Sequence, residues 1–210
     1  MIRSIELFKM MVPEKKAGYQ IYSGAVLFAS DRVVLKVIPP LPSKELLYKQ
    51  IEESEGSKSQ LIFYSWRRDE IVEAIQLYCS RGIPLPNIFE DDLASIQGIT
   101  PFQKECFEQT SRISHGETRS YAWLAGKVNK FAATRAVGGA MKANPFPILI
   151  PCHRVVSKNG EIGGYMGSKA SDSWQIALKH ALLELEQIYQ QPSLFPVQVF
   201  GTQHEHFGFE

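Results

Sequence analysis

The sequence predicts a two-domain α/β protein in which a small sheet-and-helix domain precedes a mostly helical one. β-prone apolar runs and two amphipathic helix patterns alternate over the first part of the chain. A stretch with prolines and the acidic cluster Glu90-Asp91-Asp92 interrupts them, and helical patterns dominate after it. We therefore place an N-terminal α/β domain at 1–92, a C-terminal domain at 93–190 and an aromatic tail at 191–210.

The composition is ordinary for a globular protein, with 44% hydrophobic and 21% charged residues among 210. No apolar run approaches the roughly 20 residues of a membrane helix, and the N-terminus lacks the core of a signal peptide. The three cysteines are too far apart for a disulfide framework or paired zinc ligands. We expect a cytoplasmic protein without a bound metal and without a membrane partner.

The first predicted element is a β-hairpin, with strands at 25–28 and 33–38 joined through 29–32. Proline cannot donate to a strand ladder, so the prolines at 39, 40 and 42 are expected to end the second strand.

Helical spacing predicts helices over 43–55 and 68–81, with a short strand at 61–64 between them. Gly82 is the expected stop of the second helix. We find no chemical constellation in this half, and Cys79 is expected to be a core residue.

The C-terminal domain opens with a helix-start signal. Thr100 suits the N-cap, Pro101 the first helical position and Gln103 the reciprocal capping-box position. The helix should run to about Ile113, which makes Cys106 a structural residue inside it.

A helix–turn–helix pattern follows. Ser120 caps a first helix, 127–130 form a turn, and a second helix is predicted over about 132–143. One face of the second helix carries Arg135, Gly138, Gly139 and Lys142. Each interior glycine costs about 1 kcal/mol relative to alanine. Either close approach to a narrow DNA groove or packing against another helix would explain the two glycines.

Basic residues concentrate in the same region, although the net charge is only +1. Between Arg112 and Lys158 the chain has eight basic residues and one acidic residue, Glu117. The basic residues are Arg112, Arg119, Lys127, Lys130, Arg135, Lys142, Arg154 and Lys158. This excess favours an anionic partner such as a phosphate backbone; a solvated basic face is the alternative.

The candidate nucleophile is Cys152. The apolar run 147–150 predicts a buried strand that Pro151 stops, which places the cysteine at a strand end. His153 and Arg154 follow it, and nearby cations lower the pKa of a thiol from about 8.5. Local chemistry leaves two possibilities open, an activated nucleophile and a buried structural cysteine.

Two further segments complete the C-terminal domain. Gly163-Gly164-Tyr165 is a flexible segment that could carry an aromatic ring to a pocket. A last helix is predicted over about 173–189. Glu186 lies at the edge of its apolar face, where the carboxylate either reaches inward to a histidine or stays on the surface.

Residues from about 98 to 186 together resemble the O6-alkylguanine-DNA alkyltransferases, also called methylated-DNA–protein-cysteine methyltransferases. The matching runs are 100–103, 116–121, 135–141, 144–145, 147–156, 163–165 and 179–186. The resemblance implies direct-reversal DNA repair, in which the alkyl group of O6-alkylguanine, and of O4-alkylthymine as a further substrate, passes irreversibly to Cys152. Each molecule would act once, and no cofactor would be needed.

The resemblance also implies catalytic roles. Cys152 would attack the alkyl carbon, His153 would deprotonate the thiol through a bridging water, and Glu186 would orient the imidazole. Asn144 would hold the active-site segment, and Tyr121 would donate toward guanine N3.

The implied partner is double-stranded DNA, bound by a monomer through the minor groove with the target nucleotide flipped out. The implied substrate-binding residues are Tyr121, Met141, Val155, Tyr165, Met166 and Gly167, and backbone groups at Cys152 and Val155 would read the guanine. The implied DNA-binding residues are Arg135, Gly138, Gly139, Lys142, Thr118 and Ser120. Arg135 would fill the space left in the base stack. Such a protein would work at the nucleoid, or in the nucleus of a eukaryote.

The chain departs from the family pattern in two places. Residues 166–174 are longer than the loop expected there, and the N-terminal half, expected by resemblance to be ribonuclease-H-like, lacks a zinc-binding cysteine and histidine set. Two other classes remain. A non-catalytic lesion-binding protein of the same fold would lack the cysteine, and a cysteine hydrolase would need a turnover route.

Overall fold

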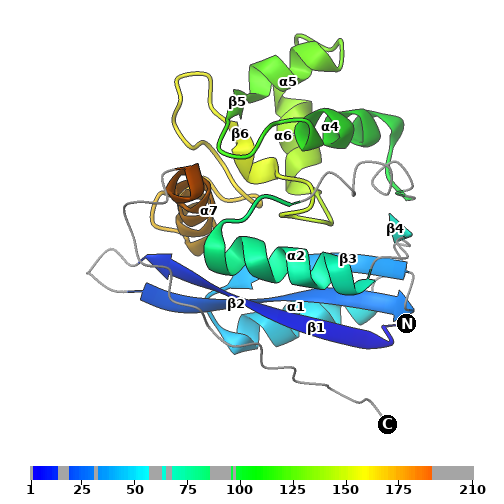
Figure 1. Ribbon diagram of the computed structural model, residues 1–210. Helices are drawn as coiled ribbons and strands as arrows, with labels where there is room; N and C mark the ends of the chain where they lie inside the picture. Colours follow the sequence, from blue (N-terminus) through cyan, green and yellow to red (C-terminus); the bar gives the residue numbers. More distant parts are fainter. Residues whose placement is uncertain are drawn as a thin grey trace.

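The computed structural model describes residues 2–13, 19–30, 33–56, 63–64, 68–85, 96 and 98–190 (Figure 1). The acidic cluster at the predicted domain boundary and the tail at 191–210 lie outside the described residues, so the domain limits stay predictions. Among the described helices, none has the length and apolarity that crossing a membrane requires.

The N-terminal half is a four-stranded antiparallel sheet between two helices. The strands, in spatial order, are β1 (Ser4–Pro13), β2 (Tyr19–Ser30), β3 (Val33–Leu41) and β4 (Phe63–Tyr64). Strand side chains alternate between the two faces. In β2, Leu27 packs in a small core with α1 (Lys44–Gly56), whereas Phe28 packs in the larger core that contains α2 (Arg68–Arg81). Figure 1 shows the two helices on opposite sides of the sheet.

The predicted hairpin is confirmed by the antiparallel pairing of β2 with β3, and the two helix predictions hold within one residue. Gly82 ends α2 as predicted, with φ +68° and its N–H donated to the Tyr78 carbonyl oxygen at 2.8 Å. The long strand β1 was not predicted, because a mixed run such as Ser4–Pro13 alternates too weakly to stand out.

The expected end of the second strand is wrong for Pro39 and Pro40, whereas Pro42 does follow its last residue. β3 continues to Leu41, with Pro39 and Pro40 inside it. Ser23 pairs with Leu41 and Ala25 with Ile38, so the two prolines form a bulge opposite a single residue of β2. A bulge leaves a residue out of the ladder, and there the missing N–H costs little.

The C-terminal half is mostly helical, with one two-stranded parallel pair. Its elements are α4 (Pro101–Ser111), β5 (Arg119–Ser120), α5 (Tyr121–Lys127), α6 (Thr134–Lys142), the 3₁₀ turn η2 (Cys152–Arg154), β6 (Val155–Val156) and α7 (Trp174–Gln190). The capping box at Thr100 and Gln103 is present, and the predicted helix ends lie within two residues of those observed. The molecule is therefore a mixed α/β fold with a small antiparallel sheet.

The predicted strand at 147–150 is wrong. Ile148 has φ +78°, and the Ile150 N–H donates to the Phe146 carbonyl oxygen at 2.8 Å, so the run is a tight buried turn. A short apolar run signals burial, but its periodicity does not distinguish a strand from other buried structure. Just before this turn, the Pro145 carbonyl oxygen accepts a hydrogen bond from the N–H of Val37 in β3 at 3.0 Å, which ties the turn to the sheet.

Candidate active site

The thiol of Cys152 lies at the start of η2 and is 4% exposed. Asn144 Nδ2 donates to the Ile150 carbonyl oxygen at 2.9 Å and also lies 3.2 Å from the sulfur. Asn144 Oδ1 accepts from the Phe146 N–H at 3.0 Å. One amide side chain therefore holds both the buried turn and the cysteine that follows it.

Burial raises the pKa of the Cys152 thiol above its ordinary value. Three neighbouring groups offset this only in part: Asn144, Lys179 and Tyr165. The expectation that His153 and Arg154 lower this pKa is wrong, because both side chains face Glu186 instead. The resting cysteine is a neutral thiol, so it needs a base before it can attack.

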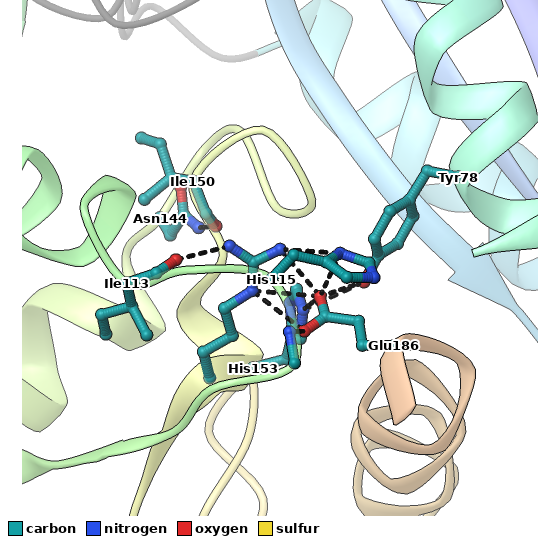
Figure 2. Close-up of polar contacts among 9 residues, drawn as sticks. Tyr78, Ile113, His115, Asn144, Ile150, His153 and Glu186 are labelled. Atoms are coloured by element: carbon teal, nitrogen blue, oxygen red, sulfur yellow. Dashed lines mark hydrogen bonds and ion pairs between the residues drawn. The ribbon is translucent and has the colours of Figure 1, made fainter. Parts of the chain in front are cut away.

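His153 and Glu186 contact each other, and both side chains are fully buried (Figure 2). His153 Nε2 lies 2.8 Å from Glu186 Oε1. Burial lowers the pKa of His153 below 6.5 despite the attraction of Glu186, so the imidazole is neutral. Since a carboxylate only accepts, Nε2 carries the proton. His153 Nδ1 then has the free lone pair, and it has no hydrogen-bond partner among the described residues.

Arg154 is an internal counter-ion rather than part of the basic surface. Its Nε lies 3.0 and 3.1 Å from the two oxygens of Glu186, and its Nη2 lies 2.9 Å from Oε1. Its Nη1 donates to the Ile113 carbonyl oxygen at 2.7 Å. Burial works against ionisation of Glu186, but His153 and then Arg154 outweigh it and hold the pKa of the carboxyl well below its usual range.

Tyr78 was missed by sequence reasoning. It lies on α2, and its hydroxyl donates to Glu186 Oε1 at 2.7 Å and is 3.1 Å from His153 Nε2. On the sequence it shares an apolar face with Ile71 and Ile75, which gave it the pattern of a core residue. The available signal was its hydroxyl, because a fully buried tyrosine usually has a hydrogen-bond partner. The N-terminal half, in which we expected no chemical constellation, therefore contributes one polar group to this cluster.

Lys179 on α7 is also fully buried. Its ammonium donates to three carbonyl oxygens, those of Val155 at 2.6 Å, Ile162 at 2.7 Å and Gly164 at 3.2 Å. Burial lowers its pKa to about 8, and the nearby Cys152 opposes that shift. Lys179 thus joins β6, the segment after it and α7 on one side of the thiol.

The predicted substrate-binding residues gather around this cluster, but several are already paired within the chain. Tyr121 donates its hydroxyl to the Gly164 carbonyl oxygen at 3.0 Å. The Val155 N–H donates to the Cys152 carbonyl oxygen, and the Val155 carbonyl oxygen accepts from Lys179. Met141 is buried, in the same core as Cys152.

Met166 and Gly167 form a tight turn that presents Tyr165. Both have positive φ, +47° and +87°, and the backbone groups of Tyr165 and Ser168 exchange two hydrogen bonds of 2.9 Å across them. Tyr165 itself is buried, 4% exposed. A Cβ on Gly167 would lie 2.8 Å from Cε of Lys142, so this loop touches α6.

The predicted DNA-binding face of α6 is open. Arg135, Gly139 and Lys142 are exposed and Gly138 is half-buried. A Cβ on either glycine would meet no other described atom within 4 Å, which contradicts the alternative that they pack against a helix. Thr118 is exposed, and Ser120 caps α5 by accepting the Trp123 N–H at 3.0 Å.

Comparison with known proteins agrees with this geometry. Residues 101–188 match the family model described as 6-O-methylguanine DNA methyltransferase, DNA binding domain. The chain is 46% identical over 89 residues to the constitutive methylated-DNA–protein-cysteine methyltransferase of Bacillus subtilis, covering 42% of this chain and 50% of that protein. It is 39% identical over 93 residues to the Salmonella typhimurium enzyme of that name, covering 44% and 54%.

A solved structure extends the likeness to both halves. The crystal structure of O6-methylguanine-DNA methyltransferase from Pyrococcus kodakaraensis matches with a TM-score of 0.60 at 28% identity, covering 86% of this chain and 98% of that one. In sequence, the chain spans about half the length of the relatives that it matches. The matched segment contains Cys152, His153 and Glu186. Residues 101–188 therefore carry the DNA-binding domain of the 6-O-methylguanine DNA methyltransferase family.

Proposed function

We propose that this protein repairs alkylated DNA by direct reversal, moving the alkyl group of O6-alkylguanine, and also of O4-alkylthymine, onto Cys152. One observation carries the proposal: a buried neutral thiol, held by Asn144, lies next in sequence to a neutral imidazole whose Nε2 proton is committed to Glu186. That arrangement supplies a nucleophile together with a base able to activate it.

In the proposed reaction, the Cys152 thiol loses its proton through a bridging water to Nδ1 of His153 as sulfur attacks the alkyl carbon. The carbon–sulfur bond forms while the bond between the alkyl carbon and guanine O6 breaks. The electron pair of the broken bond passes into the purine ring. Tyr121 leaves the Gly164 carbonyl and donates a hydrogen bond toward guanine N3. The thiol's proton, held on His153, then passes to the guanine anion, which leaves as neutral guanine, and His153 is neutral again. A thioether does not hydrolyse, so each molecule acts once.

DNA handling follows from the exposed face of α6. A base inside a duplex hides its O6 substituent, so the nucleotide must leave the stack. We infer that α5 and α6 act as a helix–turn–helix whose second helix enters the minor groove, where Gly138 and Gly139 permit close approach. Arg135 fills the vacated space, and Lys142, Thr118 and Ser120 contact the backbone.

The N-terminal half is ribonuclease-H-like, residues 1–92 and 93–190 form two domains, and a monomer is the binding unit. The protein acts in the cytoplasm at the nucleoid, or in the nucleus if its source is a eukaryote.

Mass spectrometry after mixing with an oligonucleotide that carries O6-methylguanine tests the function. One added methyl group, located on the peptide with Cys152 and absent from those with Cys79 and Cys106, is the expected result. Cys152→Ser is the control that should stay unmodified. Binding without modification would support a non-catalytic lesion-binding protein, and continuing turnover of an ester substrate would support a cysteine hydrolase.

A further inference from the structure

We propose that Tyr78 is a positioning residue for alkyl transfer, which holds Glu186 and His153 in the arrangement that leaves His153 Nδ1 free to accept a proton. The hydroxyl comes from α2, outside the segment that matches the family model. The inference rests on the proposed function, since it concerns the same His153 and Glu186 pair.

The Tyr78 side chain is buried, and its hydroxyl contacts both Glu186 and His153. Its side chain is 0% exposed, and its hydroxyl oxygen lies 2.7 Å from Glu186 Oε1 and 3.1 Å from His153 Nε2 (Figure 2). Its ring meets the ring of His115 edge-on at 6.0 Å and that of His153 at a tilt at 6.2 Å. The tyrosine therefore touches both members of the pair.

The Tyr78 hydroxyl favours the tautomer of His153 that has its proton on Nε2. Glu186 can only accept, so the single proton of Tyr78 points to Oε1, and the Nε2 proton of His153 points to the same oxygen. The lone pairs of the tyrosine oxygen then face the Nε2–H group. Without the hydroxyl, Glu186 would keep Arg154 and the Gly116 N–H as partners, and the orientation of the neutral imidazole would depend on its Nε2–H contact with Glu186 alone. The tautomer with the proton on Nδ1 would become accessible, and that tautomer cannot serve as the base.

The hydroxyl also tunes the imidazole. The titratable and charged groups around His153 are Tyr78 from α2, His115 from the loop after α4, Cys152 and Arg154 from η2, and Lys179 and Glu186 from α7. Burial, followed by the charge of Glu186, raises the pKa of Tyr78 well above 10, so it remains a donor at working pH. By donating to Glu186 it reduces the carboxylate's stabilisation of an imidazolium, which helps to keep His153 neutral.

The sequence of α2 explains how the hydroxyl reaches this point. Ile71 and Ile75 are 0% exposed and anchor the helix against the sheet. Tyr78 lies one helical turn after Ile75 on the same face, so the packing that fixes the helix also fixes the ring.

Tyr78→Phe tests the role, because it keeps the ring and removes only the hydroxyl. Single-turnover rates of methyl transfer would be measured against pH for the full chain. We expect a loss of about tenfold or more near neutral pH, the scale seen when a group that orients a functional side chain is removed. The midpoint of the acidic limb should move to higher pH, because the freed carboxylate stabilises the imidazolium better.

Tyr22→Phe is the matched control, since it also removes a tyrosine hydroxyl from the same core cluster, but on β2, where Tyr22 pairs with Met10 of β1. Replacing Tyr78 with 3-fluorotyrosine keeps the fold and strengthens the donor, so it should move the acidic limb to lower pH. A normal rate and pH profile in both Tyr78 variants would overturn the role, as would slower transfer with an unchanged midpoint. Absence of transfer in the wild-type protein would instead overturn the proposed function and, with it, this role.

Discussion

Glu186 is where residues from separate segments meet. Its carboxylate accepts hydrogen bonds from Tyr78, His153, Arg154 and the Gly116 backbone, and no solvent reaches its side chain. Removing one partner of such a buried charge destabilises the fold strongly, because the remaining charge is then buried without a compensating group. The cluster explains why Arg154, next but one to the thiol, does not activate it.

The pKa of His153, held below 6.5 chiefly by burial, predicts how stability depends on pH. The unfolded chain takes up a proton near pH 6.5 while the folded imidazole resists it. The contribution of His153 to the free energy of unfolding is therefore fully present above that pH. It is lost as the pH falls, by at most about 1.4 kcal/mol per pH unit. The Tm should fall between about pH 7.5 and 5.5, and His153→Gln should weaken that dependence.

His180→Gln is the control, because this exposed histidine lies on α7 outside the cluster. The lowered pKa of Glu186 acts only below about pH 4.5, so it does not enter this window. An unchanged slope in the His153 variant would show that the imidazole is not held neutral.

At the level of elements, two glycines make α6 less stable as a helix and leave its exposed face without side chains at those positions. Two interior glycines weaken a helix, and here neither is filled by a neighbour. Its first turn has no acidic residue, and its last carries Lys142, so the exposed face is cationic. A helix built for stability alone would have alanine at both positions.

Gly138→Ala with Gly139→Ala should therefore have two opposite effects. The free energy of unfolding should rise by about 1 kcal/mol per site, because a Cβ meets open space at both. Affinity for a lesion-containing duplex should fall, because the added methyl groups prevent the face of α6 from closely approaching the DNA groove. Urea denaturation and fluorescence anisotropy would measure the two effects.

Ser80→Ala, at an exposed position of α2, is the control for improved helix propensity away from this face. It should leave duplex affinity unchanged. Unchanged affinity in the double glycine variant would remove close approach as the reason for the glycines.

At the level of the whole molecule, one apolar core crosses the two halves. Phe28 and Ile75 of the N-terminal half belong to the same cluster as Phe107, Cys152 and Leu182. The hydrogen bond from Val37 to Pro145 and that from Tyr78 to Glu186 cross between the halves as well. α2 thus supplies Tyr78 to the candidate active site, and the sheet is hydrogen-bonded to the turn that precedes Cys152.

Ile75→Ala should destabilise both halves together. Deleting a fully buried isoleucine side chain costs about 2–5 kcal/mol, and Ile75 is 0% exposed in the shared core. Urea transitions followed by far-UV circular dichroism and by tryptophan fluorescence should shift together. Glu73→Ala on the exposed side of α2 should leave both unchanged. Separate transitions would show that the halves unfold independently.

Local signals in the sequence determined the helices and which segment is the candidate for reactivity. The capping box of Thr100 and Gln103, the cap at Ser120 and the stop at Gly82 depend on residues within a few positions of each other. The motif around Cys152 carried the family resemblance for the same reason, since its residues are contiguous.

The tertiary structure alone decided which groups act on one another. Tyr78 and Glu186 are 108 residues apart, and only packing of α2 near α7 brings the hydroxyl to the carboxylate. Arg154 and Cys152 are close in sequence, yet the arginine turns away because a buried carboxylate offers it a stronger partner than a neutral thiol. Burial likewise set the pKa of the thiol, and burial depends on the whole fold rather than on neighbours along the chain.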